Sequence, residues 1–149
     1  MLTVFWCVAV PILWKLVPQG KSTDADYGCQ ELEEMVLNAE QRGRKRNQTL
    51  LLWDNCLPHF AKKTQEKLKQ LQLEVLPQPA CSPDLAPSDY RLLRSLQHWP
   101  RGKQLKSEDD LKLELSFFES KKRSFYDYGI RSLAHRWQTI IDQHGSYFQ

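Results

Sequence analysis

Two aspartates have the residue type and the sequence setting for metal-dependent chemistry. Asp54 follows the short apolar run Thr49–Trp53, and Asp89 begins a helical pattern after a proline-rich stretch. Carboxylates brought together from two such positions can hold Mg²⁺, a hard cation that prefers oxygen ligands. Two such ions can clamp the attacking and leaving oxygens of a phosphodiester. A second interpretation stays open, because Asp after a strand is often a turn former and Asp at a helix start is often an N-cap.

The elements that would position these aspartates follow an α/β order. Runs rich in Val, Thr, Phe, Trp and Leu predict strands at 1–8, 11–17, 49–53 and 73–76, the third of them fully buried. Helices are expected after Thr23 or Asp24, from Pro58, from Ser88, from Ser107 and around Tyr126–Ile141. A non-helical loop with four prolines lies between positions 77 and 87. This order predicts an α/β domain that ends in a helical tail.

The segments around both aspartates resemble one protein family. Asp54 lies in LLWDNCLPHFAKKTQEKL and Asp89 in LEVLPQPACSPDLAPSDYRLL, with the 34 residues 55–88 between them. These segments are similar to the (H/Q)DNARPH and VLPHPPYSPDLSPTDY motifs of mariner-type DNA transposases, and the interval is the one that defines the mariner signature. The C-terminal GSYF also resembles the end of that family. The resemblance extends over nearly the whole chain, 1–149, which is expected to be one catalytic domain.

The resemblance implies an RNase H-like fold and a cut-and-paste reaction on DNA with Mg²⁺ or Mn²⁺. In that reaction water attacks the transposon end, and the freed 3′-OH then attacks target DNA. Carried over by position, Asp54 matches the second catalytic and metal-binding aspartate, and Asp89 matches the third. The matching flanking residues are Asn55, Pro58 and His59 in the first motif and Ser82, Pro83 and Asp84 in the second, where Asp84 is expected to be structural.

The same resemblance implies that a part of the family pattern is missing. The family's first catalytic aspartate precedes the segment that matches Met1, and no aspartate precedes Asp24 in this sequence. The expected fold is therefore an incomplete RNase H-like domain without its first strand, which would lie between strands 1–8 and 49–53. Unpaired strand edges invite association with another strand. Cys56, Leu57 and Cys81 also replace the family's usual Ala, Arg and Tyr.

The basic residues and the composition bear on the partner. Arg42, Arg44, Lys45 and Arg46 could contact DNA phosphates, or they could form an ordinary solvated loop. The net charge of +3 permits nucleic-acid binding without requiring it. Four widely spaced cysteines favour an intracellular protein, nuclear or cytoplasmic, over a disulfide framework. The apolar N-terminal segment is too short to span a bilayer, so no membrane partner is expected.

Three functional hypotheses follow. The first is a degenerate transposase fragment that cannot catalyse transposition alone and retains some non-specific DNA binding. The second is a nuclease that obtains its missing strand and aspartate from another chain. The third is a host-adopted interaction module that forms a homodimer or pairs with an intact transposase relative. Salt-dependent DNA binding separates the first two hypotheses from the third.

Overall fold

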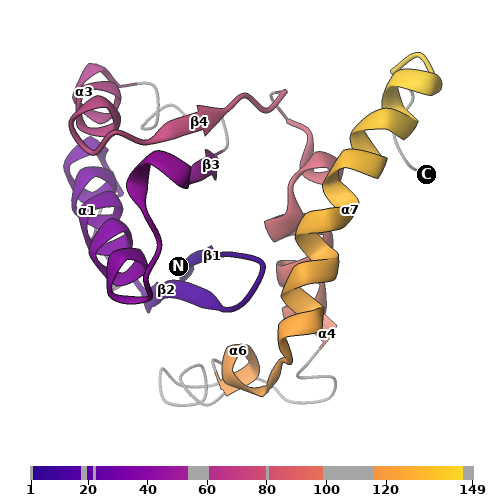
Figure 1. The fold of residues 1–149 in the computed structure, drawn as a ribbon, viewed down its shortest axis with the longest axis horizontal. Helices are drawn as coiled ribbons and strands as arrows, with labels where there is room; N and C mark the ends of the chain where they lie inside the picture. Colours follow the sequence, from indigo (N-terminus) through magenta and orange to yellow (C-terminus); the bar gives the residue numbers. More distant parts are fainter. Residues whose placement is uncertain are drawn as a thin grey trace. The chain divides into compact units, whose positions relative to one another are not determined.

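The structure is a computed structural model that describes residues 2–17, 20–21, 23–53, 61–79, 81–98 and 116–145 (Figure 1). The chain divides into two compact units, one formed by 1–6 with 11–81 and the other by 7–10 with 82–149. The first unit contains β1 (Leu2–Trp6), β2 (Pro11–Leu16), α1 (Ala25–Gln41), η1 (Arg46–Gln48), β3 (Leu50–Leu52), α3 (Lys62–Gln70) and β4 (Glu74–Leu76). The second contains η2 (Pro83–Leu85), η3 (Ser88–Leu93), α4 (Arg94–His98), α6 (Ser116–Ser120) and α7 (Arg123–Asp142). No described helix combines the length and the apolar character that a bilayer span requires.

The described strands form two separate pairs. β1 and β2 make an antiparallel hairpin in which Val4 lies opposite Trp14, with a register shift between Phe5 and Trp6. β3 and β4 pair in parallel, with Leu51 opposite Val75. All four strands lie within the ranges that the sequence predicts. The prediction of a fully buried third strand is wrong, because Leu50 is 54% exposed. The physical reason is that β3 has β4 on one side and no strand on its other side within the described residues.

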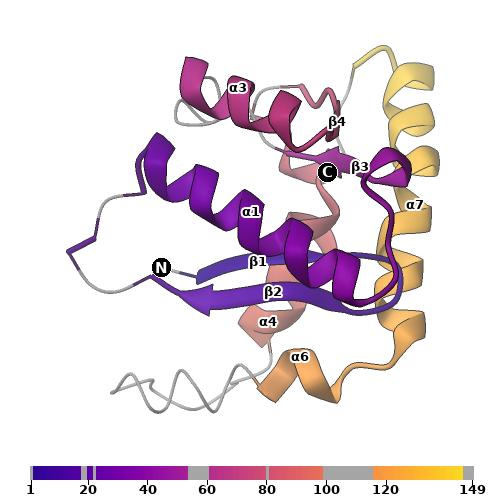
Figure 2. The same cartoon turned by 60° about the vertical axis from the view of Figure 1, so that its left-hand side comes forward.

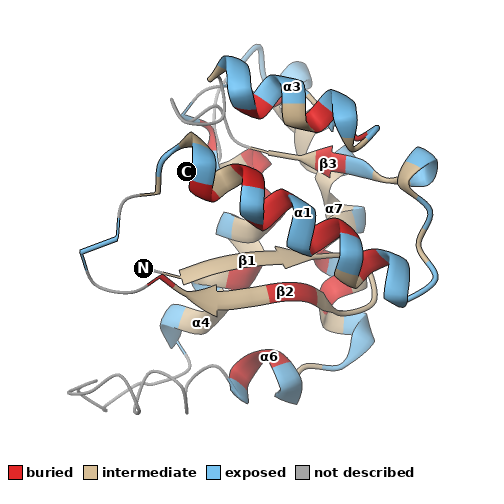
Figure 3. Ribbon diagram, turned by 90° about the vertical axis from the view of Figure 1, so that its left-hand side faces the viewer, coloured by how far each residue is buried: buried red, intermediate tan, exposed pale blue. Residues whose placement is uncertain are grey.

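Helix α1 organises the core of the first unit. Its N-cap is Asp24, whose Oδ1 accepts a 2.9 Å hydrogen bond from the Tyr27 backbone N–H. It ends before Gly43, whose φ of 77° is a left-handed conformation that glycine adopts without steric cost. One face is buried, as the helical spacing predicts, through Tyr27, Leu32, Met35, Val36 and Ala39. Figure 3 shows buried and exposed positions alternating along this helix.

Polar contacts fasten α1 to its neighbours in the first unit. Lys15 on β2 lies 2.6 Å from Glu34, and Lys67 on α3 lies 2.5 Å from Glu33. Figure 2 shows α1 beside the β1–β2 hairpin and close to α3. α3 begins at Lys62 after Ala61 in extended backbone, so the predicted helix does not run continuously from Pro58, which itself lies outside the described residues.

The core of the second unit is aromatic. Phe117, Phe118 and Tyr126 are each at most 1% exposed, and Phe117 and Phe118 meet edge to face at 5.4 Å between ring centroids. The Tyr126 hydroxyl donates a 2.6 Å hydrogen bond to the carbonyl oxygen of Phe118. Burial raises the pKa of Tyr126 to about 12. Near the end of α7, the side chain of Ile141 is 65% exposed.

Candidate metal and nucleic-acid site

Asp89 lies in an unusual stretch of helix. η3 is a π-helix in which the Asp89 carbonyl oxygen accepts the backbone N–H of Arg94, five residues ahead. The Asp89 N–H donates to the carbonyl of Ala86 at 2.9 Å, so the residue is tied into the chain on both sides. Asp89 is exposed. Short π-helical turns occur preferentially at functional sites, which fits a carboxylate that is held on a fixed backbone and exposed to solvent.

The turn that precedes Asp89 is the SPDL segment, residues 82–85. Pro83–Leu85 form a single 3₁₀ turn, and Ser82 ahead of it is 2% exposed. The turn is anchored to α7 through backbone carbonyls. Arg136 Nη1 donates to the Asp84 oxygen at 3.3 Å, and Trp137 Nε1 reaches the Leu85 oxygen at 3.5 Å. These contacts agree with a structural role for the turn that contains Asp84.

Tyr90 fixes the same helix to α7, a role that the sequence patterns did not single out. Its hydroxyl donates a 2.5 Å hydrogen bond to the Gly129 carbonyl, and Ser132 Oγ donates to that hydroxyl at 3.4 Å. The guanidinium of Arg136 lies 4.0 Å from the Tyr90 ring centroid. Burial raises the pKa of the Tyr90 hydroxyl above its ordinary value of 10.0, so it stays a donor to a higher pH than an exposed tyrosine. The π-turn that carries Asp89 is thereby braced at the adjacent residue.

Asp54 and its flanking residues Asn55, Pro58 and His59 lie outside the described residues. The described strand ahead of Asp54 ends at Leu52, and the ring of the following residue, Trp53, meets Phe5 edge to face at 6.1 Å. Because β3 and β4 run parallel, their carboxyl ends share one edge, where open α/β sheets place their chemistry. The sequence therefore places Asp54 directly after a strand of the expected kind, and its pairing with Asp89 stays a prediction.

The metal prediction likewise stays a prediction. Within the described ranges, no three His, Cys, Asp or Glu side chains come together as a metal site would require. Asp89 supplies a donor of the correct chemistry, because an exposed carboxylate suits a hard divalent cation. The second candidate ligand, Asp54, is not among these residues.

The basic residues of the predicted DNA-binding cluster, 42–46, differ in burial and in whether a carboxylate compensates their charge. Arg46 forms a two-bond ion pair with Glu40, with Nε–Oε1 at 2.5 Å and Nη2–Oε2 at 3.1 Å. The hydrogen bond from Arg46 lowers the pKa of Glu40, and Glu40 in turn raises the pKa of Arg46. Arg42 and Lys45 are exposed, and Arg44 is half-buried. Arg46 is thus already compensated by a carboxylate, which weakens its claim to a DNA phosphate.

Comparison with known proteins gives the chain a family. No protein-family model matches it. It is 35% identical over 152 residues to human histone-lysine N-methyltransferase SETMAR, covering 99% of this chain and 22% of that protein. It is 33% identical over 155 residues to the Mariner Mos1 transposase of Drosophila mauritiana, covering all of this chain and 45% of that protein. The crystal structure of the Mos1 catalytic domain matches with a TM-score of 0.91 at 32% identity, covering 99% of this chain and 75% of that one. The chain belongs to the mariner transposase family.

The family assignment confirms the fold class predicted from the sequence. The fold is that of the mariner catalytic domain, an RNase H-like α/β fold with a helical C-terminal region. Other solved mariner structures extend the likeness. One holds the Mos1 catalytic domain with Raltegravir and Mg, at a TM-score of 0.92, and another is a Mos1 paired-end complex with the left transposon end, at 0.93. The identity of 32–33% to these structures is spread over 99% of this chain.

Proposed function

We propose that this chain derives from a cut-and-paste DNA transposase, that it binds DNA, and that the 149-residue chain alone does not cleave it. The observation that carries the proposal is the likeness to the mariner catalytic domain over 99% of the chain. Structures of that domain were determined with Mg and with Mn, and complexes of the whole Mos1 transposase contain transposon ends. The chain itself spans 22% and 45% of the two relatives named above.

The proposal assigns roles to two carboxylates. Asp54 and Asp89 would hold a divalent ion, which when bound supplies charge stabilisation at the oxygens of a phosphodiester. Asp89 brings an exposed carboxylate on a backbone that is braced through Tyr90 and the SPDL turn. We expect no cleavage because the chain has fewer carboxylates to hold divalent ions than the family's site has. No aspartate precedes Asp24 in these 149 residues, so the family's first catalytic aspartate has no counterpart among them.

Strand cleavage tests this proposal directly. Supercoiled plasmid is incubated with the chain and Mg²⁺ or Mn²⁺, with an Asp54→Asn, Asp89→Asn double variant as control. We expect equal, background nicking by both proteins. Nicking by the wild type that the double variant loses would refute the inactivity and would favour a nuclease completed by a further carboxylate.

Metal binding is measured separately, by electron paramagnetic resonance of free Mn²⁺ during titration with protein. We expect weak Mn²⁺ uptake that Asp89→Asn reduces, and an unchanged melting temperature because the Asp89 side chain is exposed. Glu119→Gln is the matched control, since it removes another exposed carboxylate in the second unit. Equal Mn²⁺ uptake by wild type, Asp89→Asn and Glu119→Gln would remove Asp89 from the proposed site.

A second function is favoured by a specific observation in the first unit. β3 has one strand neighbour within the described residues, and Leu50 on it is 54% exposed. An apolar strand edge can pair with a strand of a second chain. The corresponding proposal is an interaction module that forms a homodimer or associates with an intact transposase relative. Light scattering after size exclusion tests this module, because a monomer at every concentration would exclude the homodimer.

A further inference from the structure

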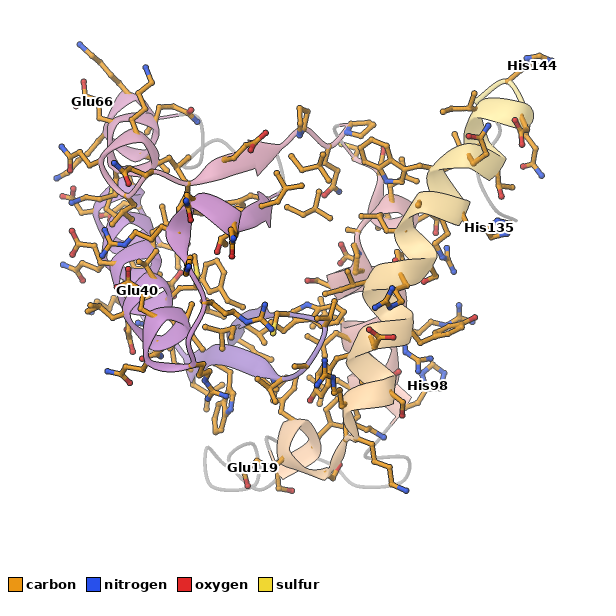
Figure 4. The ribbon with its side chains drawn as sticks, in the orientation of Figure 1. Glu40, Glu66, His98, Glu119, His135 and His144 are labelled. Carbon is orange, nitrogen blue, oxygen red and sulfur yellow. The ribbon has the colours of Figure 1, made fainter. Side chains whose placement is uncertain are left out.

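A basic pocket lies between the η3–α4 helix and α7, within the second unit. Its volume is about 530 Å³, and its cationic or titratable basic side chains are Arg91, Arg94, His98, His135 and Arg136. None of the described residues that line it is an aspartate or a glutamate. Figure 4 labels His98 and His135, which lie on the same side of α7 in that view. A concave surface with this composition favours an anionic ligand.

Two of the arginines are held in fixed orientations. The Arg91 guanidinium lies 4.3 Å from the Phe125 ring centroid and 5.0 Å from that of Tyr128. Its Nε donates to the Phe125 carbonyl at 3.3 Å. Aromatic faces and carbonyl oxygens are neutral partners, so they orient a guanidinium and leave its charge in place. An oriented guanidinium also loses less conformational entropy when it binds an anion.

Arg136, on α7, also has an aromatic face and a carbonyl oxygen among its partners. It stacks at 4.0 Å on the Tyr90 ring and donates to the Asp84 carbonyl at 3.3 Å. Arg94 and His98 are exposed at the rim, where the His98 ring Nδ1 lies 2.6 Å from the Arg94 carbonyl. The pocket thus combines two oriented guanidinium groups, those of Arg91 and Arg136, with the exposed guanidinium of Arg94. This arrangement suits phosphate, whose oxygens accept paired hydrogen bonds from guanidinium groups.

We propose that this pocket binds a phosphate group of the DNA backbone. The inference rests on the proposed DNA-binding function and assigns it to a surface other than the 42–46 loop. In that loop, Arg46 is compensated by Glu40, whereas no described acidic residue lines the pocket. The pocket also adjoins the candidate carboxylate in sequence, since Tyr90 and Arg91 follow Asp89 on one helix.

The test is the salt dependence of binding to a fluorescent 20-base-pair duplex, measured by anisotropy in EDTA. The pocket variant is Arg91→Gln with Arg94→Gln. Its matched control is Lys122→Gln with Arg123→Gln, which removes two exposed charges at the start of α7 outside the pocket. A loop variant, Arg42→Gln with Lys45→Gln, addresses the other candidate surface. Arg94→Gln alone provides a variant at an exposed position that leaves the Arg91 contacts intact.

Counterion release sets the expected size of the effect. Each lost phosphate contact lowers the slope of log K against log salt by about 0.9, so the pocket double variant, which loses one phosphate, should lose about 0.9. At 0.1 M salt this corresponds to weakening on the order of 8-fold, and Arg94→Gln alone should lose a smaller part of the slope. The control should retain the wild-type slope. Circular dichroism of each variant confirms that it is folded.

Each result decides between the pocket and its alternatives. Loss of slope in the pocket variants alone supports the proposal. An unchanged pocket variant beside a weakened loop variant overturns the pocket and leaves DNA binding as a function. Absence of binding by the wild type overturns both. Release of the duplex from the wild type by millimolar inorganic phosphate at constant ionic strength would show that phosphate and DNA compete for one site, and would support the proposal.

Discussion

The Tyr126 hydroxyl offers a test of how the second unit is stabilised. Tyr126 is 1% exposed and donates at 2.6 Å to the carbonyl of Phe118, which is also 1% exposed. Tyr126→Phe retains the ring and its edge-to-face contact with Phe125, and it removes only the donor. A buried carbonyl left without its partner costs about 1–3 kcal/mol. In a protein of this size that loss lowers the melting temperature by roughly 2–10 °C.

The raised pKa of the Tyr126 hydroxyl leads to a prediction about the stability of the fold at alkaline pH. Burial raises the pKa of Tyr126 to about 12 from an ordinary value of 10.0. The folded state therefore keeps its proton where the unfolded state has lost it. The contribution to stability is complete below pH 10 and is lost as the pH rises from 10 to 12, by up to about 1.4 kcal/mol per pH unit. Tyr126→Phe lacks this group, so its stability should fall less steeply over the same window.

Urea unfolding followed by circular dichroism at pH 7 and between pH 9 and 11 measures both effects. The matched control is Tyr128→Phe on the same helix, where the tyrosine is 64% exposed and its stacking with Arg91 is retained by phenylalanine. The control should lie within about 0.5 kcal/mol of the wild type. Equal stability of the two variants at pH 7 would refute the argument from the buried hydrogen bond.

Three further predictions concern other elements. Asp24→Ala should destabilise the protein by about 1 kcal/mol in urea, and Asp24→Asn should restore most of that loss, because asparagine also caps the Tyr27 N–H; equal losses would argue against the cap. Leu92→Ala should cost about 2–5 kcal/mol, since Leu92 is 0% exposed, and the half-buried Leu93→Ala should cost less in the same unfolding assay. Glu40→Gln should release Arg46 from its ion pair and strengthen binding to duplex DNA at low salt, and unchanged anisotropy would show that the loop takes no part.

The sequence predicted those parts of the fold that depend on local periodicity. The buried face of α1 follows from apolar residues at helical spacing, and the four strands follow from β-branched and aromatic runs. The exposure of Leu50 and of Ile141 could not be predicted in this way. Periodicity identifies the apolar face of an element, but the presence of a neighbour to cover that face depends on tertiary packing.

For the candidate site, the sequence motif predicted Asp89 but gave no indication of the π-helix or of the basic pocket. The motif around Asp89 predicted this residue as a candidate metal ligand, which stays a prediction, but an argument that assumes 3.6 residues per turn cannot find the π-helix that carries it. The basic pocket was missed because Arg91 and Arg136 come from helices far apart in sequence. No local pattern links them, and their shared aromatic and carbonyl partners are visible only in three dimensions.

The π-turn at Ser88–Leu93 has a consequence for how this helix can change. A π-turn is equivalent to one residue inserted into an α-helix, and each residue of an α-helix turns the side chains by about 100°. Deleting one residue within the turn would restore α geometry and rotate Arg94 and His98 by about that angle relative to Asp89. The π-turn therefore sets the angle about the helix axis between Asp89 at the start of this helix and Arg94 and His98 at its end. A single insertion or deletion would therefore change the angle between those two ends.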